Sequence, residues 1–218
     1  MRDRGIPRFA AALCVMALAG CVPAEFDHPL SDPALAVADS SLFGAWVAEC
    51  SSAGSVHLPE AGWGYSPNYP GILCIAPAGG GEVALVMTSP DSSRLATPWW
   101  FRGFASRLGQ ERYLNLRVTA LSLEQGRVKS LRDRRWWIVR YQLLPDGRLR
   151  LAFFDDEQAR KLIGAGRLQG EKRAEKNPRV TTGTAGLAGL LPSLPQEECF
   201  EEYGVFHRLE AVPYSPGR

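Results

Sequence analysis

The sequence predicts a mainly β domain, built as an antiparallel barrel or as a strongly twisted sheet with two short helices. Residues 136–154 (WWIVRYQLLPDGRLRLAFF) alternate between apolar and polar side chains on both sides of a Pro-Asp-Gly turn. Residues 112–121 alternate in the same way, which is typical of strands with one buried face. Helix signals occur in two segments, so strands dominate.

The clearest element is the hairpin at 136–154. Its three-residue loop, Pro145-Asp146-Gly147, has glycine where a type I turn with a bulge needs a positive φ. The turn fixes the register and pairs Val139 with Phe153, Tyr141 with Leu151 and Leu143 with Leu149. The apolar face thus holds Trp137, Val139, Tyr141, Leu143, Leu149, Leu151 and Phe153, and the other face holds Arg140, Gln142, Arg148 and Arg150.

Further strands follow from alternation along the chain. In residues 112–121 the inward side chains are Leu114, Leu116 and Val118, and the outward ones are Tyr113, Asn115 and Arg117. The other predicted strands are 41–49, 82–89, 99–105 and 203–212. Because open sheet edges invite pairing with other chains, a closed barrel is the economical arrangement. A twisted sheet with helices on one face is the competing architecture.

Two helices are predicted after the hairpin. The first begins at Asp155, three residues before Gln158, which is the spacing of a capping box, and ends at Gly164. The second lies within 181–194, with Thr181 or Thr182 as its cap. The charged segment between the helices is predicted to be a loop.

The N-terminus has the layout of a secretory signal over residues 1–20. Arg2, Arg4 and Arg8 precede an uncharged stretch from Phe9 to Gly20, which is shorter than the ~20 residues that span a bilayer. Leu18-Ala19-Gly20-Cys21 resembles the lipobox of bacterial lipoproteins. That resemblance implies that Cys21 carries a diacylglyceryl group and becomes the N-terminus of the mature protein. In the alternative, the signal is an ordinary one and Cys21 enters a disulfide.

The lipoprotein resemblance also implies a location. Val22 stands where an aspartate would resemble an inner-membrane retention signal, so the expected place is the outer membrane, facing the periplasm. The membrane is then a partner through the lipid. Residues 21–40, rich in Pro, Ala and Asp, are expected to form a flexible tether of roughly 25 Å. A single β-rich domain is expected over 41–214.

The net charge and the cysteines indicate which partners, cofactors and crosslinks to expect. Removal of residues 1–20, with three arginines and one aspartate, takes the formal charge from +2 to zero, which gives no reason to expect nucleic acid as a partner. An oxidising compartment favours a disulfide, predicted as Cys50–Cys74, with Cys74–Cys199 as the alternative. His57 has no ligand-spaced partner, so neither a metal nor a cofactor is expected.

Gly44-Ala45-Trp46 on the first predicted strand resembles the Gly-x-Trp signature of lipocalins. That resemblance implies a barrel in which Trp46 plugs the base beneath an arginine from a late strand, here Arg208. It also implies a small apolar or amphipathic ligand in the interior, in contact with Trp137, Tyr141 and Phe153. If large side chains fill the interior instead, these three residues are simply core.

No catalytic motif is present, so we predict a non-enzymatic, ligand-binding envelope protein. The alternative is an interaction module that docks on an envelope protein or a glycan. It would use the loop 57–71, where Trp63 and Tyr65 lie among glycines and prolines. A hydrolase with unrecognised catalytic groups is the third hypothesis.

Overall fold

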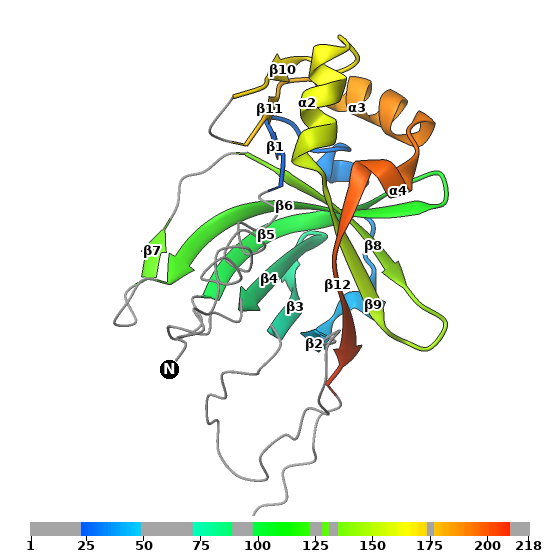
Figure 1. Cartoon of the computed structure of the whole chain (residues 1–218). Helices are drawn as coiled ribbons and strands as arrows, with labels where there is room; N and C mark the ends of the chain where they lie inside the picture. The colour runs from blue at the N-terminus through cyan, green and yellow to red at the C-terminus, as the bar shows by residue number, and fades with distance from the viewer. Residues whose placement is uncertain are drawn as a thin grey trace, which may run out of the picture.

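The fold is a closed antiparallel β-barrel of eight strands (Figure 1). The computed structural model describes residues 23–48, 72–88, 98–122, 128–130, 135–173 and 177–209. The barrel strands are β2 (Gly44–Ala48), β3 (Ile72–Gly79), β4 (Glu82–Thr88), β5 (Pro98–Leu108), β6 (Glu111–Ser122), β8 (Trp137–Leu143), β9 (Leu149–Phe154) and β12 (Phe200–Arg208). Each strand pairs with the next in this order, and β12 pairs back with β2. The predicted fold class is therefore confirmed, in its closed form.

The β8–β9 hairpin has the predicted register. Val139 pairs with Phe153, Tyr141 with Leu151 and Leu143 with Leu149. Gly147 adopts a φ of +82°, and the Leu144 amide donates to the Arg148 carbonyl at 2.8 Å. The turn residues and the alternation were together sufficient to predict this register, because both signals lie within one short segment.

Two apolar layers lie on opposite faces of the barrel wall. The inner layer fills the barrel and includes Leu114, Leu116 and Val118, as predicted for β6. The outer layer lies beneath a cap formed by α2 (Asp156–Gly164), α3 (Thr184–Leu190) and α4 (Gln196–Cys199) (Figure 1). Tyr113 and Asn115 do face outward, but the cap leaves both 0% exposed.

The first predicted helix is confirmed, and the second needs a correction. The Asp155 carboxylate accepts the Gln158 amide at 2.6 Å, and α2 ends at Gly164. Helix α3 begins after Gly183 without a side-chain cap. The Thr182 hydroxyl instead accepts the Gln169 amide at 2.7 Å, so it joins a neighbouring segment rather than the helix.

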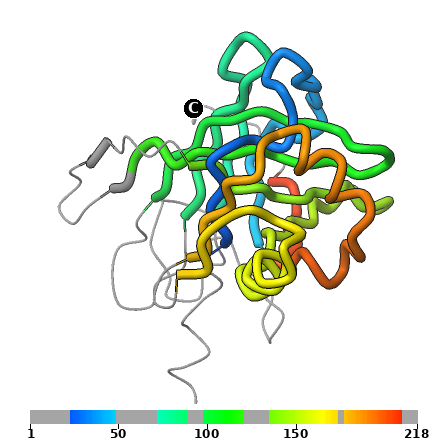
Figure 2. Tube along the Cα trace, turned by 90° about the horizontal axis from the view of Figure 1, so that it is seen from above, coloured from blue at the N-terminus to red at the C-terminus, as the bar shows by residue number. Residues whose placement is uncertain are grey.

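Residues 23–40 are part of the folded domain, so the predicted flexible tether is wrong over this range. Ala24, Phe26 and Leu30 are each 0% exposed. The segment begins with β1 (Glu25–Phe26), which joins β11 (Arg179–Val180) and β10 (Gly170–Glu171) in a small sheet. The Leu30 amide then donates to Asn115 Oδ1 at 2.7 Å, and the Val37 amide donates to the Ala105 carbonyl at 2.9 Å. Figure 2 shows this blue segment running along the outside of the barrel.

The predicted disulfide is also corrected. Cys74 and Cys199 are both free thiols. Cys74 lies on the exposed outer side of β3, between the buried Leu73 and Ile75, whereas Cys199 is buried beneath the cap. One thiol is therefore exposed and the other buried, and they do not form a disulfide. Cys50, the other predicted partner of Cys74, lies outside the described residues.

The two ends of the barrel differ in what surrounds them. We call "base" the end with the β3–β4, β5–β6 and β8–β9 hairpins, and "mouth" the end where β4 ends at Thr88 and β5 begins at Pro98. Strand β7 (Val128–Ser130) pairs with the mouth end of β6. Within the described parts of the chain, no helix has the length and apolarity needed to cross a bilayer.

Candidate functional site

A cluster of six aromatic rings lines the inner wall of the barrel toward the mouth. Neighbouring ring centroids lie 5.0 to 6.4 Å apart. The members of this mouth cluster are Trp99 and Phe101 on β5, Trp137 on β8, Phe153 on β9, and Tyr203 and Phe206 on β12. Rings at these distances attract one another beyond simple burial.

Alternation on β5 and a bulge on β12 place these rings. Trp99 and Phe101, two residues apart on β5, stack at 6.4 Å and 17° on the same side, and the register shift beside them leaves its extra residue, Thr119, on β6. On β12 the extra residue of the bulge is Tyr203, and its ring contacts both Phe153, at 5.0 Å, and Phe206, at 6.2 Å. Such bulges re-aim a side chain without interrupting the strand.

Exposure increases from the bottom of the mouth cluster to its top. Phe101 and Phe206 are at most 2% exposed, Trp99 and Trp137 are half-buried, and Tyr203 is 40% exposed. The cluster contains no charged side chain. A surface of this kind favours apolar chains and rings, which gain by leaving water and by dispersion contacts.

The predicted ligand-contacting residues divide between the two ends of the barrel. Trp137 and Phe153 belong to the mouth cluster, with centroids 5.9 Å apart. Tyr141 faces the same interior but lies nearer the base. Trp63 and Tyr65, with the whole loop 57–71, lie outside the described residues.

Four members of the cluster, Trp99, Phe101, Tyr203 and Phe206, were not among the ligand-contacting residues predicted from the sequence. The inward position of Trp99 could have been predicted from the alternation of 99–105, which places its side chain on the same side as that of Phe101. The position of Tyr203 could not have been predicted, because a bulge changes the side of the strand on which a side chain lies and has no local signature in the sequence.

The base of the barrel is closed around Trp46. Its side chain is 0% exposed, and its indole Nε1 donates to the Leu42 carbonyl at 2.9 Å. The Arg208 guanidinium lies over the indole, 4.6 Å from the ring centroid, and also donates to the Ser41 carbonyl. A short 3₁₀ helix, Ser40–Leu42, leads into this arrangement. The structure thus brings together the two residues predicted to close the barrel.

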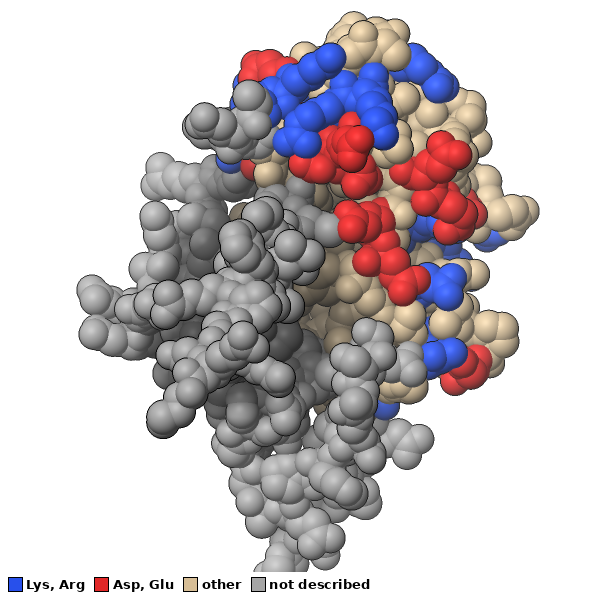
Figure 3. Space-filling model, in the orientation of Figure 1, with Lys and Arg blue, Asp and Glu red and all other residues tan. Residues whose placement is uncertain are grey.

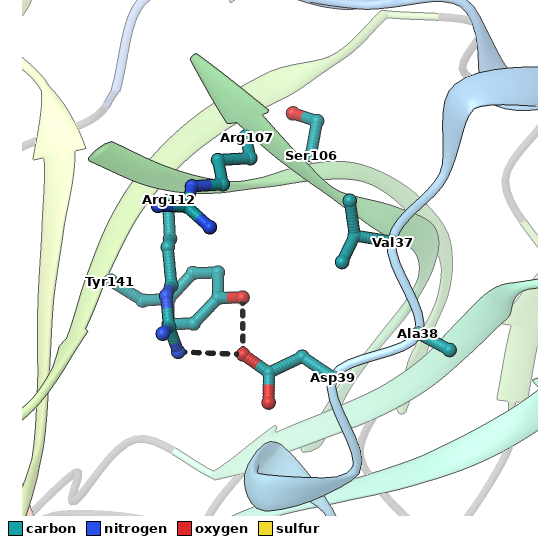
Figure 4. A pocket seen from close by; sticks show the side chains of 7 residues that line it. All are labelled: Val37, Ala38, Asp39, Ser106, Arg107, Arg112 and Tyr141. Carbon is teal, nitrogen blue, oxygen red and sulfur yellow. Dashed lines mark hydrogen bonds and ion pairs between the residues drawn. The ribbon is translucent and has the colours of Figure 1, made fainter. Parts of the chain in front are cut away.

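A small pocket of about 180 Å³ lies beside the closed base (Figure 4). The Tyr141 hydroxyl donates to Asp39 Oδ2 at 2.8 Å, and Arg112 Nη1 lies 3.1 Å from the same oxygen. The other lining residues are Val37, Ala38, Ser106 and Arg107. Arg107 hydrogen-bonds the β5–β6 turn through the Gly109 carbonyl and Gln110. The charged groups and Tyr141 therefore bind one another or the turn, and the Ser106 hydroxyl accepts a hydrogen bond from Asn115 Nδ2 at 2.9 Å. We call the group of Asp39, Tyr141 and Arg112 the latch, because it joins residue 39 to two strands at the base.

Burial, hydrogen bonds and charge within the latch shift the pKa values of Asp39 and Tyr141. Burial raises the pKa of Asp39, but hydrogen bonds from Ser41 and Tyr141 and the charge of Arg112 outweigh it, so the pKa lies below its ordinary value. For Tyr141, burial and the hydrogen bond to Asp39 raise the pKa. At neutral pH Asp39 is therefore an anion that accepts a hydrogen bond from the neutral phenol of Tyr141.

We expect Asp39→Asn to lower the free energy of unfolding by about 1 kcal/mol at pH 7, since hydrogen bonds to a charged acceptor are stronger than those to a neutral one. A lowered folded-state pKa contributes stability that is present above the unfolded pKa and is lost as pH falls through the folded pKa. The difference between the two proteins should hold from pH 8 to 5 and shrink below about pH 4. Urea unfolding at pH 7, 5 and 3 measures it.

Asp32→Asn is the control for the latch, because Asp32 caps another 3₁₀ helix on the exposed surface and accepts the Ala34 amide at 2.9 Å. Two results would contradict the role given to the latch. One is an equal free energy of unfolding for Asp39→Asn and wild type at pH 7, and the other is a difference that grows as the pH falls.

Charges on the cap are arranged in pairs. Figure 3 shows basic side chains gathered over the cap with acidic ones directly below them. The ion pairs of this region join Arg160 to Asp156, Lys161 to Glu157, Arg173 to Glu171 and Arg179 to Asp27. These four pairs neutralise part of the positive charge of the cap locally.

Comparisons with known proteins add no assignment. Among the described residues, no group of three or more His, Cys, Asp or Glu side chains is placed to hold a metal ion. No family model matches the chain, and searches of curated proteins and of solved structures give no match either.

Proposed function

We propose that this protein is a lipid-anchored, non-enzymatic component of the cell envelope whose barrel binds a small apolar or amphipathic ligand at its mouth. The observation that carries this proposal is the mouth cluster, whose rings extend from the buried interior to the half-exposed Trp99 and Trp137. A lipid anchor on Cys21 and a location in the outer membrane, facing the periplasm, rest on the lipobox resemblance.

The partial exposure of the cluster favours a ligand over a purely structural role. Trp46, at the closed base, is 0% exposed, as expected of a tryptophan that only stabilises the fold. Trp99, Trp137 and Tyr203 keep apolar surface in contact with water. A ligand that covered such surface would gain roughly 25 cal/mol for each Å² removed from water.

We expect Trp137→Ala to weaken binding of an apolar probe at least tenfold, because the burial of one large apolar side chain is worth about 1.5–3 kcal/mol. The test uses residues 22–218, secreted without the lipid, and titration with dansyl-undecanoic acid followed by its fluorescence. Binding should fall more than the melting temperature does.

Trp99 and Trp100 provide a matched pair for the same titration. They are adjacent on β5, but Trp99 lies in the mouth cluster at 5.9 Å from Trp137, whereas Trp100 belongs to neither apolar layer. Trp99→Ala should weaken binding and Trp100→Ala should leave it within twofold. Equal affinity in all three variants and the wild type would refute the mouth as the binding site.

A further inference from the structure

The chain joins the folded domain almost immediately after the predicted anchor. Pro23 is buried, and Ala24 is 0% exposed with its amide donating to the Phe154 carbonyl at 3.3 Å. The Glu25 amide then donates to the Pro178 carbonyl at 3.0 Å. From Ala24 onward the backbone is therefore held by the domain.

This attachment point lies at the mouth. Phe154 is the last residue of β9 at that end. Trp136 directly precedes the first residue of β8, and it exchanges two backbone hydrogen bonds with Phe26, at 2.9 and 2.7 Å. In Figure 2 the blue chain starts at this point and passes from there toward residues 37–42 at the base.

The reach of the link follows from its length. Cys21 precedes Pro23 by two residues, and an extended chain spans at most about 3.6 Å per residue. A lipid on Cys21 thus lies within about 7 Å of Pro23, against the roughly 25 Å that a free tether of residues 21–40 would have allowed.

We propose that the barrel docks mouth-first on the bilayer that holds its lipid anchor, and that its ligand is an amphiphile taken directly from that bilayer. This inference rests on the proposed function, because it uses both the lipid on Cys21 and the mouth cluster. The short link brings the mouth to the lipid surface, and the base hairpins point away into the water.

The chemistry of the mouth suits a lipid interface. Trp and Tyr side chains favour the boundary between headgroups and acyl chains, and the mouth cluster presents Trp99, Trp137 and Tyr203 with part of their surface exposed. The base, in contrast, carries the charged hairpin side chains Asp146 and Arg148, joined at 2.7 Å. An acyl chain leaving the bilayer at the mouth would meet rings without crossing open water.

The test compares two fluorophores on the full lipidated chain in phosphatidylethanolamine–phosphatidylglycerol vesicles. Glu201→Cys, paired with Phe153, places a label near the mouth, and Gln110→Cys places one at the base; both residues are exposed. Cys50 and Cys74 are replaced by serine so that the label attaches at one position. The length of β4, seven residues at about 3.3 Å each, separates the two ends by roughly 20 Å or more.

Phospholipids that carry a spin label on the headgroup quench only nearby fluorophores. We expect them to quench the Glu201→Cys label at least threefold more than the Gln110→Cys label. Equal quenching, or stronger quenching at the base, would overturn the proposal. Preferential quenching that requires an added membrane protein would identify a protein partner at the mouth and would overturn it as well.

A 20-residue Gly/Ser insertion between Val22 and Pro23 is the matched control. It adds roughly 25 Å of flexible reach, so quenching of the Glu201→Cys label should fall at least twofold, and uptake of a fluorescent fatty acid from the vesicles should slow several-fold. Unchanged quenching would refute the claim that the short link sets the orientation.

The two proposals can fail separately. If the lipid-free domain binds dansyl-undecanoic acid but the two labels are quenched equally, the mouth-first orientation is wrong and ligand binding stands. If the labels differ as expected but the lipid-free domain binds no apolar probe, the docked orientation stands and ligand uptake from the bilayer is wrong. A mass of the N-terminal peptide without acyl chains on Cys21 would overturn both the anchor and the orientation.

Discussion

Trp46→Ala is expected to lower the free energy of unfolding by about 3–5 kcal/mol, the range measured when a large buried aromatic side chain is truncated. The indole is 0% exposed and fills the base of the barrel. Its loss would leave a cavity, an unpaired Leu42 carbonyl and an Arg208 guanidinium without its ring. Since a single domain is stable by only about 5–15 kcal/mol, much of the stability would be lost.

Urea denaturation with two companion variants separates these contributions. Trp46→Phe keeps a ring but removes the indole N–H that bonds Leu42, and it should cost less than the alanine variant. Arg208→Ala removes the cation above the ring from an exposed position, for about 0.5–1 kcal/mol. A cost below about 1.5 kcal/mol for Trp46→Ala would show that the base is held together mainly by other contacts.

Gly103→Ala is expected to prevent the barrel from folding stably. Gly103 lies on β5 opposite Leu116, and a Cβ built there would stand 1.8 Å from the Asn115 carbonyl oxygen and 3.0 Å from the Leu116 Cα. Both atoms belong to the backbone of β6, so a change of side-chain rotamer cannot relieve the clash. The two most extensively paired strands of the barrel would have to separate or shift register.

Gly189→Ala is the control, because Gly189 lies on α3 with no atom within 4 Å of its built Cβ. Alanine there should stabilise the helix by about 0.5–1 kcal/mol. The checks are soluble yield, far-ultraviolet circular dichroism and melting temperature. A Gly103→Ala protein that melts within a few degrees of wild type would mean that β5 and β6 can yield at this crossing.

Local signals predicted the local parts of the structure. The Asp146-Gly147 turn gave the register of β8 and β9, and the spacing from Asp155 to Gln158 gave the start of α2, since each depends on a few neighbouring residues. The closed base around Trp46 was expected only from the resemblance of Gly44-Ala45-Trp46 to the lipocalin signature. The contact of Trp46 with Arg208 required the family resemblance as well, because the two residues are far apart in the chain.

The remaining features depend on distant partners. Residues 23–40 have the composition of a linker, yet Phe26 and Leu30 are buried by contacts with segments more than 80 residues away. The latch between Asp39 and Tyr141 joins residues 102 positions apart. Periodicity reports only that a strand has an apolar side, and it cannot say what covers the other side. For that reason the cap over Tyr113 was not foreseen.

The pairing of β1 with β11 affects the time course of folding. Arg179 on β11 and Asp27 directly after β1 are hydrogen-bonded to each other and lie 152 residues apart, and the Arg208–Ser41 hydrogen bond that joins β12 to the base spans 167. On the proposal that Cys21 carries a lipid, a chain exported from its N-terminus would present that residue long before the segments that bury Ala24 have emerged. Modification at Cys21 would meet an open chain, and closure would wait for the last strand. Such long-range pairing is typical of slow folders, with times from milliseconds to seconds, so any factor that shields an unpaired β2 edge would act during that interval.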